Sequence, residues 1–300
     1  MSHNHADHIT DSHLLRHSRA FAVGIGLNII FVLVEVTYGL LANSSALLAD
    51  AGHNASDVLS LVFAWAAAWM ATLKPKGKFT YGLRKTTILV SVLNALLLFG
   101  AVAMIAIDAI RKLKEPEPVA GPQVMIVAGI GILINGFTAL LFAKGQKEDL
   151  NIKGAYLHMV ADAAVSLGVV VAGLFITLTG KSWIDPLTSF IIIGVIIWGT
   201  WHLFVDSVSL ALDAVPKHIK IDEIEAFLME KEEIQGIHDL HVWAISTTQV
   251  ALSAHLLVPE LPVKNLLLEL QQGLETKFGI RHTTFQFEDA KDEKYCLTKC

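Results

Sequence analysis

The chain of 300 residues is 53% hydrophobic, and only 17% of its residues are charged, with a mean hydropathy of +0.54. Soluble globular domains carry about 25% charged residues, so this composition indicates a protein of the lipid bilayer. It excludes a disordered chain, which would be poor in apolar residues, and a disulfide scaffold, since there are only 2 cysteines. The net charge of −5 also argues against a nucleic-acid-binding protein.

Six segments are long and apolar enough to cross a bilayer, which takes roughly 20 residues. They are residues 20–41, 45–73, 86–110, 124–143, 155–178 and 183–212. Charged, proline-containing or glycine-containing breaks separate them, as expected for loops between spans. The sequence therefore predicts an all-α transmembrane bundle of six helices.

Beyond about residue 214 the sequence becomes charged, and no later apolar run is long enough to span a bilayer. Residues 221–231 have helical spacing, and residues 237–245 and 250–258 read as a β-hairpin. A second helix over 262–277 and a third strand over 282–288 complete a small α+β domain of order αββαβ.

We therefore expect four regions: a histidine-containing tail (1–17), a six-helix transmembrane domain (18–213), an α+β domain (214–290) and a cysteine-containing tail (291–300). Lysines and arginines concentrate on the flanks that share a side with the N-terminus, which places both termini in the cytoplasm. A bacterial inner membrane is favoured over an organelle membrane. In a reducing cytoplasm the two cysteines should be thiols.

Ionisable residues are costly in hydrocarbon, so those inside the predicted spans are candidates for function. His53 and Asp57 lie in the second span, and His158 and Asp162 lie in the fifth. Both pairs have the spacing His-x-x-x-Asp, which puts histidine and aspartate on one helix face. Asp50 shares that face of the second span. Because the two spans are antiparallel and each aspartate lies near mid-span, we expect two imidazoles and two carboxylates around one point.

Four nitrogen and oxygen ligands suit a tetrahedral zinc site, and two aspartates neutralise a divalent cation. An empty site of this kind takes up protons instead, so metal and protons compete for the same atoms. This chemistry is that of a metal/proton exchanger.

The other acidic residues of the predicted spans are expected to have structural roles rather than to bind metal. Asp108 and Asp185 lie near span ends, and Glu35 is expected to hydrogen-bond to a neighbouring helix.

Three stretches of the sequence resemble the cation diffusion facilitator family of divalent-metal/proton antiporters, in its zinc-transporting type. SALLADAGHNASD (45–57) is similar to the second-helix signature, GAYLHMVADAAVS (154–166) to the fifth-helix signature, and GIHDLHVW (236–243) to the start of the first cytoplasmic strand. The resemblance implies a homodimer, alternating access and a transport site at the four residues derived above.

The resemblance also implies metal binding in the cytoplasmic domain, with zinc as its ligand. By position, one such site comprises His238, His255, His282 and Glu288, and Cys296 with Cys300 would form part of a second. Imidazole, carboxylate and thiolate groups suit zinc. Histidines of the N-terminal tail are either solvated or capture metal weakly.

The hypothesis from the sequence is a homodimeric antiporter that exports zinc, and also cadmium, cobalt or iron, in exchange for protons. Two alternatives stay open. A membrane metal sensor would bind metal without moving it, although no output motif follows the bundle. An intramembrane zinc hydrolase would need an open coordination position for water, which a complete set of four ligands does not leave.

Overall fold

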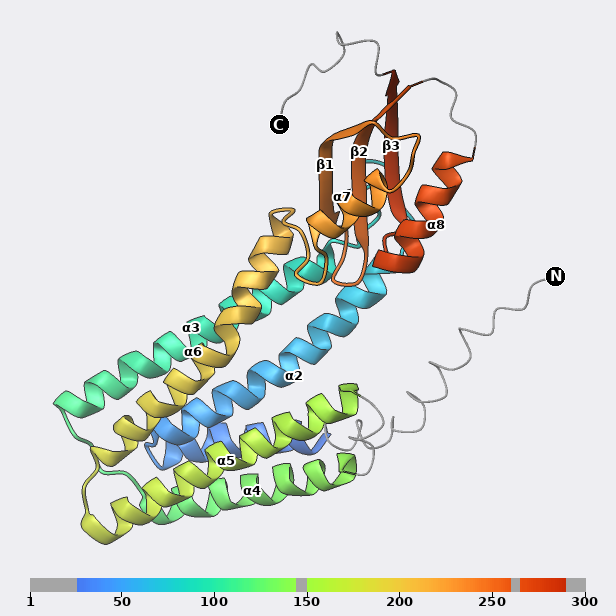
Figure 1. Ribbon diagram of the computed structural model, residues 1–300. Coiled ribbons are helices and arrows are strands. Elements are labelled where there is room, and N and C mark those ends of the chain that lie inside the picture. The colour runs from blue at the N-terminus through green and yellow to red at the C-terminus, as the bar shows by residue number, and fades with distance from the viewer. Residues whose placement is uncertain (1–25, 144–149, 260–264, 290–300) are drawn as a thin grey trace. The chain divides into compact units, whose positions relative to one another are not determined.

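The computed structural model describes residues 26–143, 150–259 and 265–289 (Figure 1). Its apolar helices are Gly26–Leu41, α2 (Ser45–Ala71), α3 (Thr86–Lys114), α4 (Gly121–Phe142), α5 (Leu150–Thr179) and α6 (Ile184–Ala211). The C-terminal elements are α7 (Ile221–Met229), β1 (Gly236–Ala244), β2 (Val250–Val258), α8 (Leu266–Phe278) and β3 (His282–Asp289). The chain forms two compact units, residues 1–62 with 94–201 and residues 63–93 with 202–300.

Within the described residues, 4 helices are long and apolar enough to span a membrane, namely α3, α4, α5 and α6. α2 has 27 residues, which is long enough, but it carries Asp50, His53 and Asp57 and is not one of these four helices. The description of the preceding helix begins only at Gly26. A multi-pass membrane protein is therefore evident, while the expected count of six spans is not fully confirmed.

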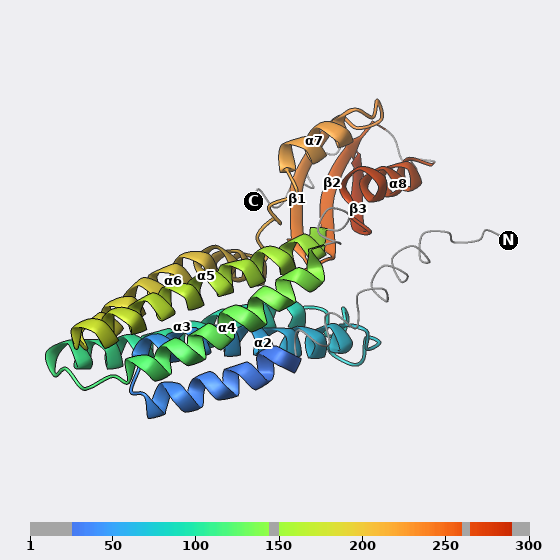
Figure 2. The same cartoon turned by 90° about the horizontal axis from the view of Figure 1, so that it is seen from below.

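In the first unit α4 and α5 lie side by side (Figure 2). Two glycines permit their close approach: a Cβ atom on Gly121 would lie 2.8 Å from the carbonyl oxygen of Gly173. Small residues are the usual means by which membrane helices bring their backbones together, since lipid provides no hydrophobic driving force between them. The contact holds α5, which carries His158 and Asp162, against α4.

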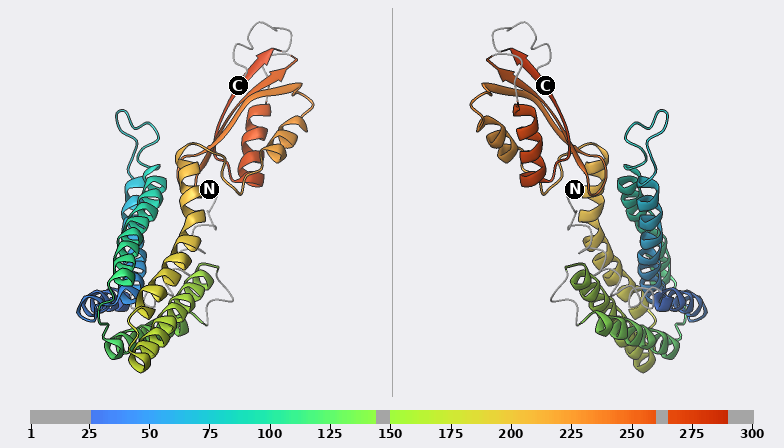
Figure 3. Two further views of the ribbon diagram at one scale, coloured as in Figure 1. Left: turned by 90° about the vertical axis from the view of Figure 1, so that its left-hand side faces the viewer. Right: turned by 90° about the vertical axis from the view of Figure 1, so that its right-hand side faces the viewer.

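The second unit contains the C-terminal elements in the expected order αββαβ. Its sheet has strand order β1-β2-β3, with β1 and β2 antiparallel and β2 and β3 parallel. α7 and α8 cover one face of this sheet (Figure 3). The core between helices and sheet is apolar, as the alternating burial of β2 requires. Its fully buried members include Ile224, Leu228, Leu252, Leu256, Leu270 and Leu274.

The contact between α7 and α8 depends on Gly273. A Cβ atom there would lie 2.2 Å from the Cζ atom of Phe227. We expect Gly273→Ala to lower the free energy of unfolding by about 1–3 kcal/mol, because the ring must leave its site in a close-packed core. Thermal unfolding of the full chain in detergent measures this. Thr276→Ala, on the same helix, is the control and should change little; an unaltered unfolding temperature for Gly273→Ala would refute this packing.

Candidate metal centres

The first candidate metal centre lies between α2 and α5. His53 and Asp57 come from α2, one helical turn apart, and His158 and Asp162 come from α5 with the same spacing. His158 Nε2 lies 3.1 Å from Asp57 Oδ2, and His53 Nε2 lies 3.5 Å from Asp162 Oδ1. Each helix therefore pairs its histidine with the aspartate of the other. The structure brings together all four residues that the sequence spacing selected.

Contacts within each helix complete the cluster. His53 Nε2 is 3.7 Å from Asp57 Oδ2, and His158 Nε2 is 3.6 Å from Asp162 Oδ2. One ligand atom each of His53, Asp57 and Asp162 lie within 4.8 Å of one another. The side chain of Asp162 is only 3% exposed, whereas that of Asp57 is 34% exposed. Such a set of acceptors can hold a divalent cation or protons, and burial makes an empty, fully ionised state costly.

Asp50, which shares the α2 face in sequence, takes no part in the ion pairs that join these four residues. Its carboxylate instead accepts a hydrogen bond from Ser166 Oγ of α5, at 3.0 Å. Glu35 accepts one from Asn54 Nδ2, also at 3.0 Å, which is the interhelical hydrogen bond expected from the sequence. Both carboxyl groups therefore lie outside the candidate ligand set.

Two other acidic residues, which the sequence places near span ends, have polar partners there. Lys112 Nζ lies 3.0 Å from Asp108 Oδ2 on α3. Asp185, in the first turn of α6, accepts hydrogen bonds from the Ser44 hydroxyl and, at 2.7 Å, from the Ser45 backbone N–H. A carboxylate at the start of α2 complements the helix dipole there. This contact of Asp185 was not predicted, because nothing local marks a cap contributed from 140 residues away.

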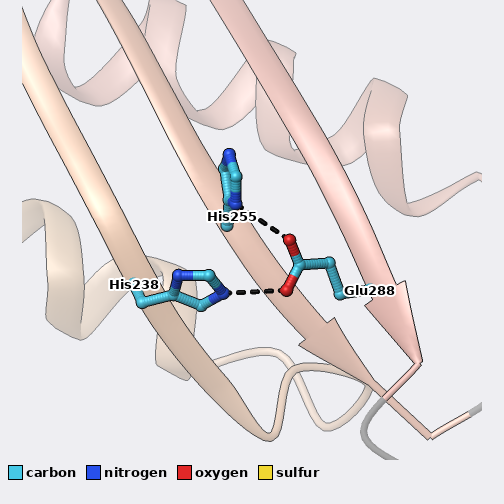
Figure 4. A group of neighbouring side chains, drawn as sticks. All are labelled: His238, His255 and Glu288. Carbon is cyan, nitrogen blue, oxygen red and sulfur yellow. Dashed lines mark hydrogen bonds and ion pairs between the residues drawn. The ribbon is translucent and has the colours of Figure 1, made fainter. Parts of the chain in front are cut away.

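The second candidate centre lies on the C-terminal sheet, where each strand contributes one side chain (Figure 4). His238 on β1 is directly opposite His255 on β2. The carboxylate of Glu288 on β3 contacts both rings: its Oε2 is 2.9 Å from His238 Nε2, and its Oε1 is 2.8 Å from His255 Nδ1. These three residues meet the spacing of a metal site.

Burial favours the neutral form of Glu288, but hydrogen bonds from His238 and Gln286 and the nearby imidazoles outweigh it, so the pKa of this carboxyl group is lowered. Glu288 is consequently ionised near neutral pH. It offers a metal a carboxylate that need not first lose a proton.

A β-bulge adds to this cluster a residue that the sequence did not predict. The register of β1 shifts between His238 and His241, and Asp239 has a φ of +53°. Asp239 Oδ2 lies 3.6 Å from His255 Nε2, and its Oδ1 lies 2.9 Å from His241 Nε2. Strict alternation would put Asp239 on the face opposite His238, and only the bulge, which re-aims side chains, brings it to the cluster.

The expectation that His282 joins this cluster is not met. His282 begins β3 and pairs with Ala251, whereas Glu288 stands six residues further along the same strand, about 20 Å away. The His282 Nε2 atom instead accepts a hydrogen bond from Arg84 Nη1 at 3.1 Å. Arg84 also donates to Gln249 Oε1 at 2.8 Å. The side chain thus contacts the segment before α3 rather than the cluster.

Cys296, Cys300 and the histidines of the N-terminal tail lie outside the described residues. Their predicted roles in metal binding stay predictions.

Comparison with known proteins gives two family matches. The model of the cation efflux transmembrane domain matches residues 21–210, and that of the cation efflux protein cytoplasmic domain matches residues 216–290. Among similar curated proteins is the metal cation efflux system protein CzcD of Cupriavidus metallidurans, 33% identical over 92% of this chain and 88% of that protein.

Two further relatives carry transporter names. The zinc transporter ZitB of Escherichia coli is 32% identical over 96% of this chain and 93% of that protein. The cadmium, cobalt and zinc/H(+)-K(+) antiporter of Bacillus subtilis is 34% identical over 86% of this chain and 85% of that protein. The resemblance inferred from the motifs is thereby confirmed, and the chain belongs to the cation efflux family, also called the cation diffusion facilitator family.

Proposed function

We propose that this protein is a secondary transporter that exports divalent metal, zinc foremost, from the cytoplasm in exchange for protons. The single observation that carries the proposal is the cluster of His53, Asp57, His158 and Asp162 between two helices that the sequence assigns to the membrane. The mixture of imidazole and carboxylate ligands suits zinc, and also admits cadmium, cobalt and ferrous iron. Its relatives are named as efflux systems, zinc transporters and antiporters.

Exchange follows from the ligands themselves. Zinc entering from the cytoplasm displaces protons from the histidines and aspartates, because these groups bind metal only when deprotonated. After the bundle reopens to the other side, protons return to the same atoms and release the metal. Alternating access requires the site to face one side at a time, which two helices rocking about a fixed site accomplish.

We also propose a membrane topology and an oligomeric state for this protein. Both termini lie in the cytoplasm of a bacterium, with six helices across the inner membrane and residues 214–290 as a cytoplasmic domain. This domain joins two copies of the chain into a homodimer, and its metal site adjusts transport to the cytoplasmic zinc level. Both proposals extend the family match over residues 216–290.

Zinc flux into proteoliposomes of the purified protein, with and without an imposed pH gradient, tests the exchange. We expect zinc uptake to require the gradient, and proton movement in the opposite direction to require zinc. Tight zinc binding without flux under either condition would instead support the metal sensor. Metal-dependent cleavage of a peptide or lipid would support the hydrolase.

The metal site of the C-terminal domain is tested by Glu288→Gln. Replacing the carboxylate removes a charged ligand shared by His238 and His255, so zinc affinity at this site should fall by at least about 100-fold, the upper end of losses seen for outer-shell partners alone. Calorimetric titration of full-length protein carrying Asp162→Asn, which removes the other site, measures it. Glu275→Gln on α8 is the matched control. Unchanged zinc binding by Glu288→Gln would contradict the assignment.

A further inference from the structure

Two buried carboxyl groups beside the transport site have no part in metal binding. Glu35 belongs to the helix Gly26–Leu41 and Asp50 to α2, and both residues are fully buried, at 0% exposure. Among the described residues no lysine or arginine forms an ion pair with either group. Buried carboxylates are ordinarily compensated by a cation, so a different compensation is needed here.

The hydrogen bonds of the two groups leave one oxygen on each without a donor. Glu35 Oε2 accepts from Asn54 Nδ2, and Asp50 Oδ2 accepts from Ser166 Oγ, both at 3.0 Å. Glu35 Oε1 and Asp50 Oδ1 are buried and accept no hydrogen bond from an N–H or O–H of the described residues. Asn54, which donates to Glu35, lies one helical turn after Asp50 on α2, so the two carboxyl groups are neighbours at the same face of this helix.

A single proton supplies both the missing hydrogen-bond donor and the missing positive charge. Two ionised carboxylates in contact repel strongly in a low-dielectric interior, and pairs of this kind share a single proton. A proton on either remaining oxygen donates to the other, so that all four oxygens of the pair are satisfied. It also reduces the charge of the pair from −2 to −1. An unsatisfied buried acceptor would otherwise destabilise the folded protein.

We propose that Glu35 and Asp50 form a proton-binding site that holds one shared proton in the metal-free protein and releases it to water when a divalent cation binds to His53, Asp57, His158 and Asp162. The inference rests on the proposed function. The titratable groups that share these helix faces are Asp162, one turn before Ser166 on α5, and His53, three residues after Asp50 on α2, and both are members of the metal site. A cation held by these two residues favours the fully ionised pair, and its departure favours reprotonation. Each metal ion that binds therefore releases one proton from the Glu35–Asp50 pair in addition to the protons released by the four ligands.

Proton release on zinc binding tests the site. Zinc is added to the purified full-length protein in detergent and weak buffer, with a pH indicator reporting protons and calorimetry reporting bound zinc. We expect Glu35→Gln to release about one proton fewer per zinc than the wild type, because the amide cannot ionise. Asp50→Asn should show the same deficit. The control is Glu115→Gln, which replaces an exposed residue directly after α3 and should release as many protons as the wild type.

Infrared difference spectroscopy of the wild type provides a measurement that needs no variant to fold. The spectrum should lose a protonated-carboxyl band when zinc is added, and the band should be reduced in Glu35→Gln. Equal proton release by wild type and Glu35→Gln, with zinc still bound, would overturn the proton site while leaving the transport site intact. Persistent zinc binding by an Asp57→Asn and Asp162→Asn double variant that also carries Glu288→Gln would instead overturn the transport site itself.

Discussion

Asp162→Asn is expected to reduce pH-driven zinc flux in proteoliposomes to the level of empty liposomes. Asp162 is the most buried member of the transport site, with a side chain 3% exposed, and its two oxygens face both histidines, at 3.5 and 3.6 Å. Asparagine has nearly the same shape, so the helices should still pack. It removes one of the two negative charges that neutralise a divalent cation, and an amide neither ligates zinc well nor carries a proton at neutral pH.

The matched control is Asp206→Asn, which removes a carboxylate on α6 that pairs with Lys217 at 2.6 Å. It should retain flux close to that of the wild type. Both variants are first compared with the wild type by thermal unfolding in detergent, so that loss of flux is not loss of fold. Zinc flux driven by a pH gradient in a folded Asp162→Asn protein would contradict the assignment of the transport site.

The transport site could be predicted from the sequence because each half of it consists of two residues that are close together in the sequence. His53 with Asp57 and His158 with Asp162 each share a helix face through a four-residue spacing, and charges at mid-span are seldom tolerated without a purpose. The only non-local step was that α2 and α5 are neighbours, and the equal depth of the two pairs suggested it. The structure gives the cross-helix contacts that the sequence could not, such as His158 to Asp57.

The site on the C-terminal sheet was less predictable, since it depends on strand register and on a bulge. His238, His255 and Glu288 come together because β1 and β2 are antiparallel while β3 runs parallel to β2. The parallel register puts the start of β3, and with it His282, at the other end of the sheet from Glu288. Asp239 reaches the cluster only through its left-handed backbone conformation, for which an aspartate gives a weak signal.

The start of α2 likewise depends on one contact within the local sequence and on another from a distant part of the chain. Ser44 caps the start of α2, since its Oγ accepts the Leu47 N–H at 3.1 Å. The partner that orients this cap, Asp185, comes from the start of α6 and could not be read from local sequence. Because both hydrogen bonds are buried, Asp185 supports the beginning of the helix that carries His53 and Asp57.

Replacing Asp185 should therefore destabilise the protein strongly without touching the metal ligands. Asp185→Ala leaves the Ser44 hydroxyl and the Ser45 N–H without their acceptor, at about 1–3 kcal/mol, and weakens the cap of α2, at about 0.5–2 kcal/mol. We expect a loss of about 2–4 kcal/mol in the free energy of unfolding from these combined effects.

Thermal unfolding in detergent should show a clearly lower midpoint temperature for Asp185→Ala and a smaller decrease for Asp185→Asn, whose side chain keeps one acceptor oxygen. Ser189→Ala, one turn further along α6, removes only a hydroxyl that donates to the Asp185 carbonyl and serves as the control. If Asp185→Ala unfolded at the temperature of the wild type, the start of α2 would not depend on this carboxylate, and the link between the helix ends and the position of the metal ligands would have to be abandoned.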